Sequence, residues 1–238
     1  MSFKSFFAVA AFGIAAASAA NAAVITTTAT GTINYVDSVN GAYGNVQVGQ
    51  SFNLVMSFAY DPSQIYSYSY NYSGYNGCSS CLYGYTQANS YSPLSISLKV
   101  NGQVLSPQGT FTNSYAYASE TSDLGWEEYL QSGSSGSFYD GNTSSSSYIY
   151  AYMGGANLLN GLASFQGSVS AGQATSTGFG LQQYFYNYQS GLSSSDYLYG
   201  TVDSLIVTTN AVPEPAGIAL LAFGIFGLGV ARRRQFKK

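Results

Sequence analysis

Apolar and polar residues alternate with a period of two along much of the chain. Residues 95–100 read Ser-Ile-Ser-Leu-Lys-Val, and Asn101-Gly102 separates them from Gln-Val-Leu at residues 103–105. Such alternation is typical of half-buried β-strands, and Asn-Gly is the preferred pair for a two-residue type I′ turn. The pattern therefore predicts a β-hairpin over residues 95–105.

Four other segments carry strand patterns. Residues 24–36 and 201–208 are rich in β-branched side chains, which favour strands. Residues 178–188 are a further strand candidate, and residues 46–60 read as two strand stretches broken near Gly49. Several short strands between Gly, Ser and Asn turns are typical of an all-β domain.

We therefore predict an all-β fold, a single β-sandwich with jelly-roll-like character, over residues 23–208. One segment is expected to differ. Ser122 can cap a short helix over residues 123–131, with Trp126 and Leu130 on one side.

Tyrosine alternates with small polar residues in three segments, and in a strand each set projects from one face. One interpretation is a cross-strand aromatic ladder that covers the core, with each phenol at a polar rim. Another is a platform on which sugar rings stack, and a third is a flexible Tyr/Ser loop, favoured most for residues 66–92. The first set is the candidate for glycan contact: Tyr66, Tyr68, Tyr70 and Tyr72. The other two sets are Tyr148, Tyr150 and Tyr152, and Tyr184, Tyr186 and Tyr188.

Charge excludes some partners. Residues 23–211 contain nine acidic residues and one basic residue, Lys99, which gives a formal charge of −8. A surface of this sign repels phosphate backbones, so we expect no nucleic-acid binding. It also has no basic patch for anionic lipids.

Residue types argue against catalysis. The chain has no histidine, which excludes Ser-His-Asp and Cys-His hydrolases. Glu127 and Glu128 are adjacent, so they point in different directions and fit a solvated face better than a glycosidase pair. No Asp-x-Asp-x-Asp pattern favours calcium, although acidic side chains and loop carbonyls leave a calcium site open. We expect no catalytic residue, no metal and no cofactor.

The first 22 residues have the three parts of a secretory signal peptide. Lys4 supplies the positive charge, residues 6–17 supply an apolar run too short to span a bilayer comfortably, and Ala20-Asn21-Ala22 supplies a cleavage site. We expect cleavage before Ala23 and export across the inner membrane.

Cys78 and Cys81 are the two cysteines of the chain. In an exported protein this Cys-x-x-Cys pair predicts a local disulfide. A zinc site would require further Cys or His ligands, and a thioredoxin-like redox site would require a βαβ context.

The C-terminal segment has three parts in a fixed order. Residues 209–215 form a linker that ends in Val212, Pro213, Glu214 and Pro215, and the two prolines favour an extended, accessible chain. Residues 216–231 carry no charge and predict a short transmembrane helix. Residues 232–238 are basic, beginning with Arg232, Arg233 and Arg234, and the positive-inside rule leaves them in the cytoplasm.

This tail closely resembles the PEP-CTERM sorting signal of Gram-negative bacteria, a tail also called the ice-binding protein C-terminal domain. The resemblance implies recognition and cleavage by an exosortase-type membrane protease, and an association with exopolysaccharide and biofilm matrix. Val48-Gly49-Gln50-Ser51-Phe52 and Tyr60-Asp61-Pro62 also look like the opening of many passenger domains of such proteins. The resemblance does not imply that the body binds ice.

Together these features predict an exported, exosortase-sorted protein of the cell surface or extracellular matrix without catalytic activity, anchored transiently in the membrane before processing. One alternative is a carbohydrate-binding module that uses the Tyr-rich strands. The other is a glycosidase or lyase acting on exopolysaccharide.

Overall fold

The computed structural model describes residues 23–38, 43–72, 81–90, 93–107, 110–121, 127–159 and 167–211. The predicted signal peptide, most of the linker with its Pro-Glu-Pro motif, the predicted transmembrane helix and the basic tail lie outside these residues. The compact unit spans Val24–Asn210. Its strands are β1 (Ala23–Ser38), β2 (Ser51–Tyr60), β3 (Tyr66–Tyr72), β4 (Cys81–Ser90), β5 (Pro93–Val100), β6 (Gln103–Leu105), β7 (Asn113–Thr121), β8 (Glu128–Tyr139), β9 (Thr143–Gly155), β10 (Gly167–Ser170), β11 (Ser176–Asn187) and β12 (Leu192–Ala211), with one 3₁₀ turn, η1 (Pro62–Gln64).

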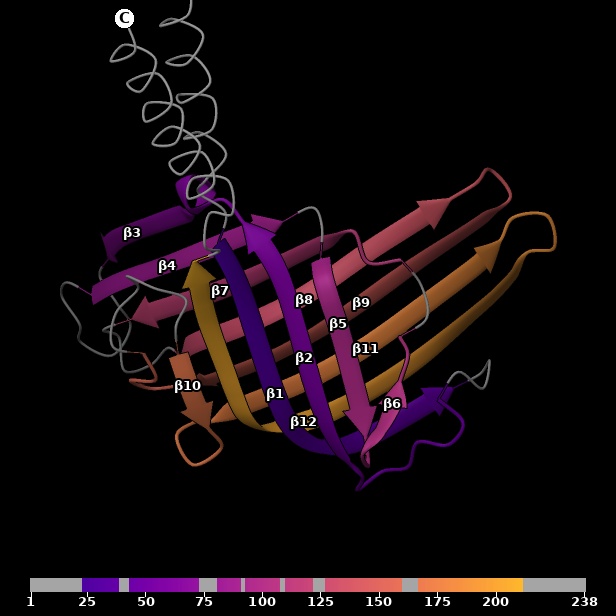
Figure 1. The fold of residues 1–238 in the computed structure, drawn as a ribbon, viewed down its shortest axis with the longest axis horizontal. Coiled ribbons are helices and arrows are strands. Elements are labelled where there is room, and N and C mark those ends of the chain that lie inside the picture. Colours follow the sequence, from indigo (N-terminus) through magenta and orange to yellow (C-terminus); the bar gives the residue numbers. More distant parts are fainter. Residues whose placement is uncertain are drawn as a thin grey trace, which may run out of the picture. The chain divides into compact units, whose positions relative to one another are not determined.

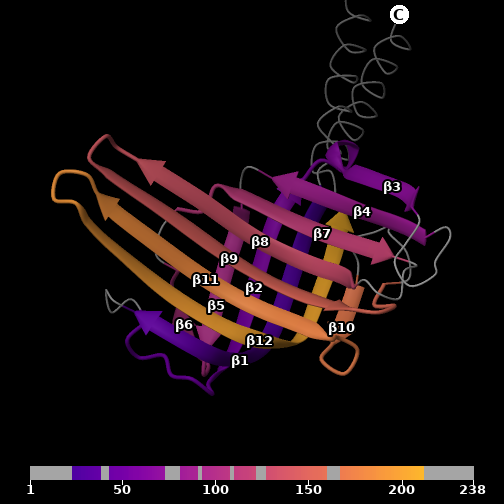
Figure 2. The ribbon, with the colours of Figure 1, turned by 180° about the vertical axis from the view of Figure 1, so that it is seen from behind.

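The described residues are nearly all β, which confirms the predicted class. The strands form one antiparallel sheet in the order β3-β4-β7-β8-β9-β11-β12-β1-β2-β5-β6, with β10 added beside β12 (Figure 1). This differs from the predicted jelly-roll-like sandwich, because hydrogen bonds run without a break from one end of this order to the other. The sheet folds over, so that β1, β2 and β5 cross β7, β8, β9 and β11 (Figures 1 and 2).

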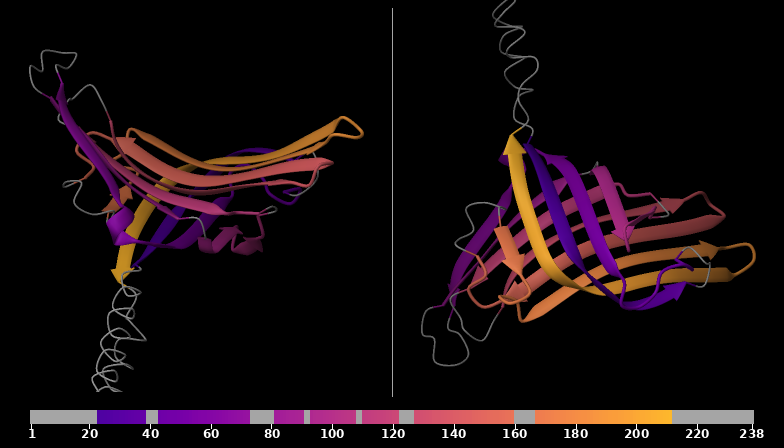
Figure 3. Two further views of the ribbon diagram at one scale, coloured as in Figure 1. Left: turned by 90° about the horizontal axis from the view of Figure 1, so that it is seen from above. Right: turned by 60° about the horizontal axis from the view of Figure 1, so that its bottom comes forward.

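The fold-over occurs in the long strands β1 and β12, which bend and take part in both layers (Figure 3). The first part of β12 pairs with β11 up to Gly200, and a later part, from Ser204 to Val207, pairs with β10. Glycines allow the close approach at this corner. A Cβ at Gly31 would collide with the Thr201 carbonyl oxygen, and a Cβ at Gly200 would lie 2.5 Å from the Thr32 carbonyl oxygen.

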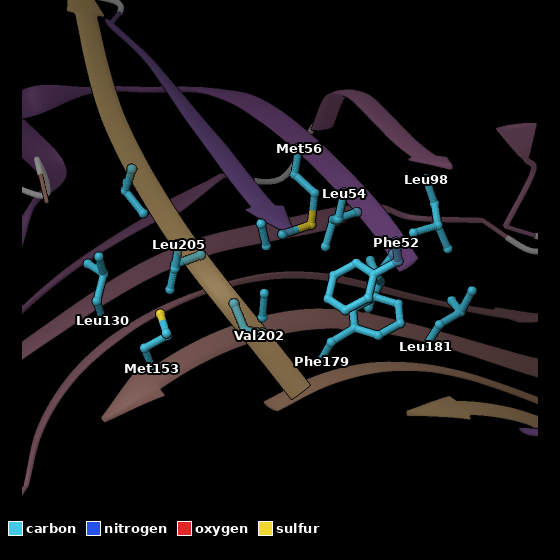
Figure 4. Close-up of a cluster of buried hydrophobic side chains, with 14 of the residues drawn as sticks. Phe52, Leu54, Met56, Leu98, Leu130, Met153, Phe179, Leu181, Val202 and Leu205 are labelled. Carbon is cyan, nitrogen blue, oxygen red and sulfur yellow. The ribbon is translucent and has the colours of Figure 1, made fainter. Parts of the chain in front are cut away.

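The core lies between the two layers. Phe52 of β2 stacks on Phe179 of β11, with ring centroids 4.3 Å apart and ring planes at 25° (Figure 4). Leu54, Leu98 and Leu181 are fully buried around them. These apolar positions alternate along their strands as the sequence predicts, because a folded sheet buries one face of each strand.

One part of the core contains a buried pair of polar residues joined by a hydrogen bond. The Tyr43 hydroxyl donates a hydrogen bond to Gln183 Oε1 at 2.6 Å, and both residues are buried. Asp196, also buried, lies opposite Gln183 on β12. Burial, followed by the negative charge of Asp196, raises the pKa of the Tyr43 phenol well above its ordinary value.

The predicted hairpin is confirmed. β5 and β6 pair around Asn101 and Gly102, whose φ angles of 49° and 79° are both positive, as a type I′ turn requires. The strand patterns at residues 24–36 and 201–208 fall within β1 and β12, and the pattern at residues 178–188 falls within β11 except for its last residue. In the 46–60 segment only β2 forms, since residues 46–50 make turns in which Gly49 has a φ of 90°.

The predicted helix over residues 123–131 is wrong where the structure describes it. Residues 128–131 begin β8, and residues 122–126 lie outside the described residues. Leu130 is buried in the core, whereas Tyr129 and Gln131 project from the other face. The period of two that continues along β8 outweighs the local capping signal, because pairing with β7 and β9 satisfies the backbone on both sides.

Candidate functional site

The strands β3, β4, β7, β8, β9, β11 and the first part of β12 form one layer of the folded sheet. One face of this layer is lined with tyrosines. The strand registers place them together: Tyr68 lies opposite Tyr85, and Tyr150 lies opposite Gly133 on one side and Gly180 on the other. On β4, β7, β8, β9, β11 and β12 the opposite face carries buried side chains, whereas on β3 it carries the exposed residues Ser67, Ser69 and Asn71. We call the outward surface the tyrosine face; it comprises Tyr66, Tyr68, Tyr70, Tyr83, Tyr85, Tyr115, Tyr117, Tyr129, Tyr139, Tyr148, Tyr150, Tyr152, Tyr184, Tyr186, Tyr197 and Tyr199.

Neighbouring rings on this face contact one another across strands. Ring centroids lie 5.7 Å apart for Tyr85 and Tyr117. Hydroxyls also pair, with 2.8 Å between the oxygens of Tyr83 and Tyr117 and 2.8 Å between those of Tyr115 and Tyr148. The ladder interpretation is therefore confirmed for the ring contacts, but the ladder lies on the face that points away from the core.

Glycines beneath the rings shape the face. The phenol end of Tyr152 occupies the space that a Cβ at Gly178 would take, and Tyr150 does the same at Gly180. At Gly133 a Cβ would lie 2.8 Å from the ring of Tyr115. Each of these rings leans over a neighbouring strand and covers the backbone of its glycine, and all three tyrosines are partly exposed.

An open depression of about 430 Å³ lies over β8, β9 and β11. Within it the rings of Tyr150 and Tyr152 are nearly parallel, at 19°, with centroids 6.3 Å apart. Aromatic faces, amides and a hydroxyl thus surround one shallow space. Its lining residues are Tyr129, Gln131, Tyr148, Tyr150, Tyr152, Ser176 and Gln182.

Glu127 lies beside this depression. Its Oε2 accepts hydrogen bonds from the hydroxyls of Tyr129 at 2.7 Å and Ser176 at 2.6 Å, and its Oε1 accepts one from Thr175. The bonds from Ser176, Thr175 and Tyr129 hold the pKa of the Glu127 carboxyl below its ordinary value. The carboxylate is therefore ionised at neutral pH.

Glu128 points the other way, as expected for adjacent residues in an extended chain. It is buried, and its Oε2 accepts a hydrogen bond from the Leu159 backbone N–H at 2.9 Å. Glu127 and Glu128 thus lie on opposite faces of the sheet and do not flank a common substrate.

Three of the four predicted glycan-contact residues, Tyr66, Tyr68 and Tyr70, lie at the edge of the tyrosine face. Tyr66, Tyr68 and Tyr70 are 53%, 48% and 45% exposed on the edge strand β3, and Tyr72 pairs with Cys81 in register. The flexible-loop interpretation is wrong for these four positions, which form a strand. Sequence reasoning missed the tyrosines of β4, β7, β8 and β12. For β8, the expectation of a helix over residues 123–131 hid the strand pattern at Tyr129.

Several predicted sites lie outside the described residues. Cys78 is among them, so the disulfide with Cys81 stays a prediction. The sorting residues Val212, Pro213, Glu214, Pro215, Arg232, Arg233 and Arg234 also lie there. Within the described ranges, no cluster of three His, Cys, Asp or Glu side chains is arranged to hold a metal ion. In the same ranges, no helix has the length and apolar character needed to cross a membrane.

Comparison with known proteins gave one match. No curated protein and no solved structure is significantly similar to the chain. Residues 211–235 match the family model described as the PEP-CTERM protein-sorting motif, which confirms the resemblance predicted for the tail. The motif implies processing by an exosortase, a membrane protein, and thus indicates that the chain is an exported protein sorted through its C-terminal segment.

Proposed function

We propose that the protein is a non-catalytic component of the cell surface or extracellular matrix that binds exopolysaccharide through its tyrosine face. The observation that carries this proposal is the array of partly exposed tyrosine rings on one side of a single sheet. Aromatic faces provide apolar contact area with a polar tip, and the C–H faces of sugar rings stack on such surfaces. A sheet-wide array suits a long polymer better than a small molecule, which would fit an enclosed pocket.

The absence of catalysis is part of the proposal. A glycosidase needs two carboxyl groups on either side of the scissile bond. Glu127 and Glu128 lie on opposite faces of β8 and the segment before it, so they do not form this pair. A glycosidase or lyase acting on exopolysaccharide remains the alternative, and it predicts a turnover that Glu127→Gln or Glu128→Gln abolishes.

Export and sorting give the protein its place of action. In this proposal the tail holds the chain briefly in the inner membrane, the exosortase cleaves near Pro213-Glu214-Pro215, and the body acts outside. Intact-mass spectrometry of the native protein from inner membrane, outer surface and medium tests this step. A mature chain that retains Arg232–Arg234 in the inner membrane would contradict it.

Binding is tested by retention on immobilised polysaccharides from the producing cells. We expect the unmodified protein to be retarded, Tyr150→Ala/Tyr152→Ala to lose most of the retention, and Tyr68→Ala/Tyr70→Ala to lose part of it. Val104→Ala is the matched control, since Val104 is 69% exposed on β6, away from the tyrosine face. Equal elution of all four proteins would overturn the proposal.

A further inference from the structure

Among the residues that the structure describes, the hydrogen bonds to the Glu127 carboxylate come from neutral hydroxyl groups. Tyr129, Ser176 and Thr175 donate three hydrogen bonds to it. A carboxylate offers about four acceptor positions on its two oxygens, so Glu127 retains capacity for a further donor. Hydroxyl groups orient the carboxylate but do not neutralise its charge.

No basic side chain compensates this charge among the described residues. Lys99 is the one lysine or arginine in the described part of the chain, and it lies on β5, outside the strands that carry the tyrosine face. Glu127 is only partly buried, so a solvent-borne cation can reach it. Within the described ranges, the site therefore has no basic side chain as a counter-ion.

The aromatic rings near Glu127 also favour a positively charged ligand. Tyr129 and Ser176 both line the depression and both bind Glu127, which places the carboxylate at its rim. The rings of Tyr129 and Tyr152 have centroids 6.3 Å apart, and Tyr148 and Tyr150 continue the cluster at 5.2 Å. The negative faces of aromatic rings attract cations, and an ammonium group among such rings is a recurring mode of recognition.

We propose that this depression binds the protonated amino-sugar units of a polysaccharide, with Glu127 accepting the ammonium group while the sugar ring stacks on Tyr150 and Tyr152. This inference rests on the proposed function and names its ligand class. It adds selectivity: polymers of uronic acids are disfavoured because their carboxylates face Glu127, and fully N-acetylated or neutral polymers lack the cation. The amides of Gln131 and Gln182 offer hydrogen bonds to the sugar hydroxyls.

The test compares two soluble oligosaccharides of equal length, a glucosamine tetramer and an N-acetylglucosamine tetramer, titrated into the folded protein by calorimetry at mildly acidic pH. We expect the glucosamine tetramer to bind more tightly. Glu127→Gln should weaken it about two- to fivefold, the range of a partly exposed ion pair, and leave the N-acetylated tetramer unchanged. Glu120→Gln, which removes the same charge from β7, is the matched control and should change neither.

The outcomes separate this inference from the proposed function. Equal affinity of the unmodified protein for both tetramers, or an equal loss in Glu120→Gln and Glu127→Gln, would overturn the amino-sugar assignment and leave polysaccharide binding intact. Binding of neither tetramer, together with no retention on any polysaccharide, would overturn both. Circular dichroism of Glu127→Gln establishes that the sheet is unchanged.

Discussion

Gly180 of β11 lies directly opposite Tyr150 of β9, and the phenol of Tyr150 fills the space above it that a side chain would need. The same relationship joins Gly178 with Tyr152. Glycine weakens a strand by itself, but a cross-strand aromatic ring covers its backbone and restores contact. The tyrosine face therefore depends on where the glycines stand as much as on the tyrosines.

Gly180→Ala should destabilise the domain. The new Cβ would require the Tyr150 ring to move, and overpacking of this kind costs about 1–3 kcal/mol. Urea unfolding followed by circular dichroism measures the loss. Gly172→Ala is the control, because Gly172 lies in an exposed turn with open space around its Cβ position, and it should change stability by less than about 1 kcal/mol. Similar unfolding midpoints for the two variants would contradict this account of the face.

The stacked pair of Phe52 and Phe179 gives a second prediction, since it joins the two layers of the folded sheet. Either Phe→Ala substitution should cost about 3–5 kcal/mol by leaving a cavity in the core. The double variant should cost less than the sum by about 0.5–1.5 kcal/mol, the range for an aromatic pair. A double-mutant cycle from chemical unfolding gives the coupling, and strictly additive losses would show that the rings contribute independently.

The sequence predicted the strands far better than their connection into one sheet. Alternation at residues 95–105 and the Asn101-Gly102 turn are local, so the hairpin could be predicted. The corner at Gly31 and Gly200 could not, because those glycines matter only when β1 and β12 lie side by side, and that pairing joins residues from opposite ends of the domain. A sandwich and a sheet that folds over itself have the same alternation in each strand.

The candidate site was predictable only in part for the same reason. The Tyr-x-Tyr pattern of residues 66–72 and 148–152 marks one face of each strand. That these strands contribute to a common face follows from the registers of β4, β7 and β8 between them, which no local pattern specifies. The place of Glu127 beside Ser176 likewise depends on β11 reaching the start of β8 across β9.

Tyr43→Phe supplies a third prediction, on the buried polar pair. The substitution removes the donor to Gln183 Oε1 and leaves that oxygen buried without this bond. Gln183 Nε2 already has no hydrogen-bond partner among the described residues. Loss of one partner from a buried hydrogen bond costs about 1–3 kcal/mol. Thermal unfolding should report the loss, and Tyr35→Phe, at a 47% exposed position, should leave stability nearly unchanged. A Tyr43→Phe variant as stable as the unmodified protein would mean that the bond contributes nothing net.

On titration with base, the domain should unfold at a lower pH than its low content of charged residues would predict. Burial is the main cause that raises the pKa of the Tyr43, Tyr83 and Tyr115 phenols above their ordinary value near 10. These phenols stay neutral in the folded state while those of the unfolded chain ionise, so the unfolded state binds fewer protons and the free energy of unfolding falls as pH rises above about 10.

Absorbance of tyrosinate and far-ultraviolet circular dichroism, recorded together from neutral to strongly alkaline pH, should show part of the tyrosine titration coinciding with loss of the sheet. Tyr115→Phe should reduce the pH dependence. If all tyrosines ionise while the circular dichroism stays native, the phenols of the face are freely solvated and the packing described for them is wrong.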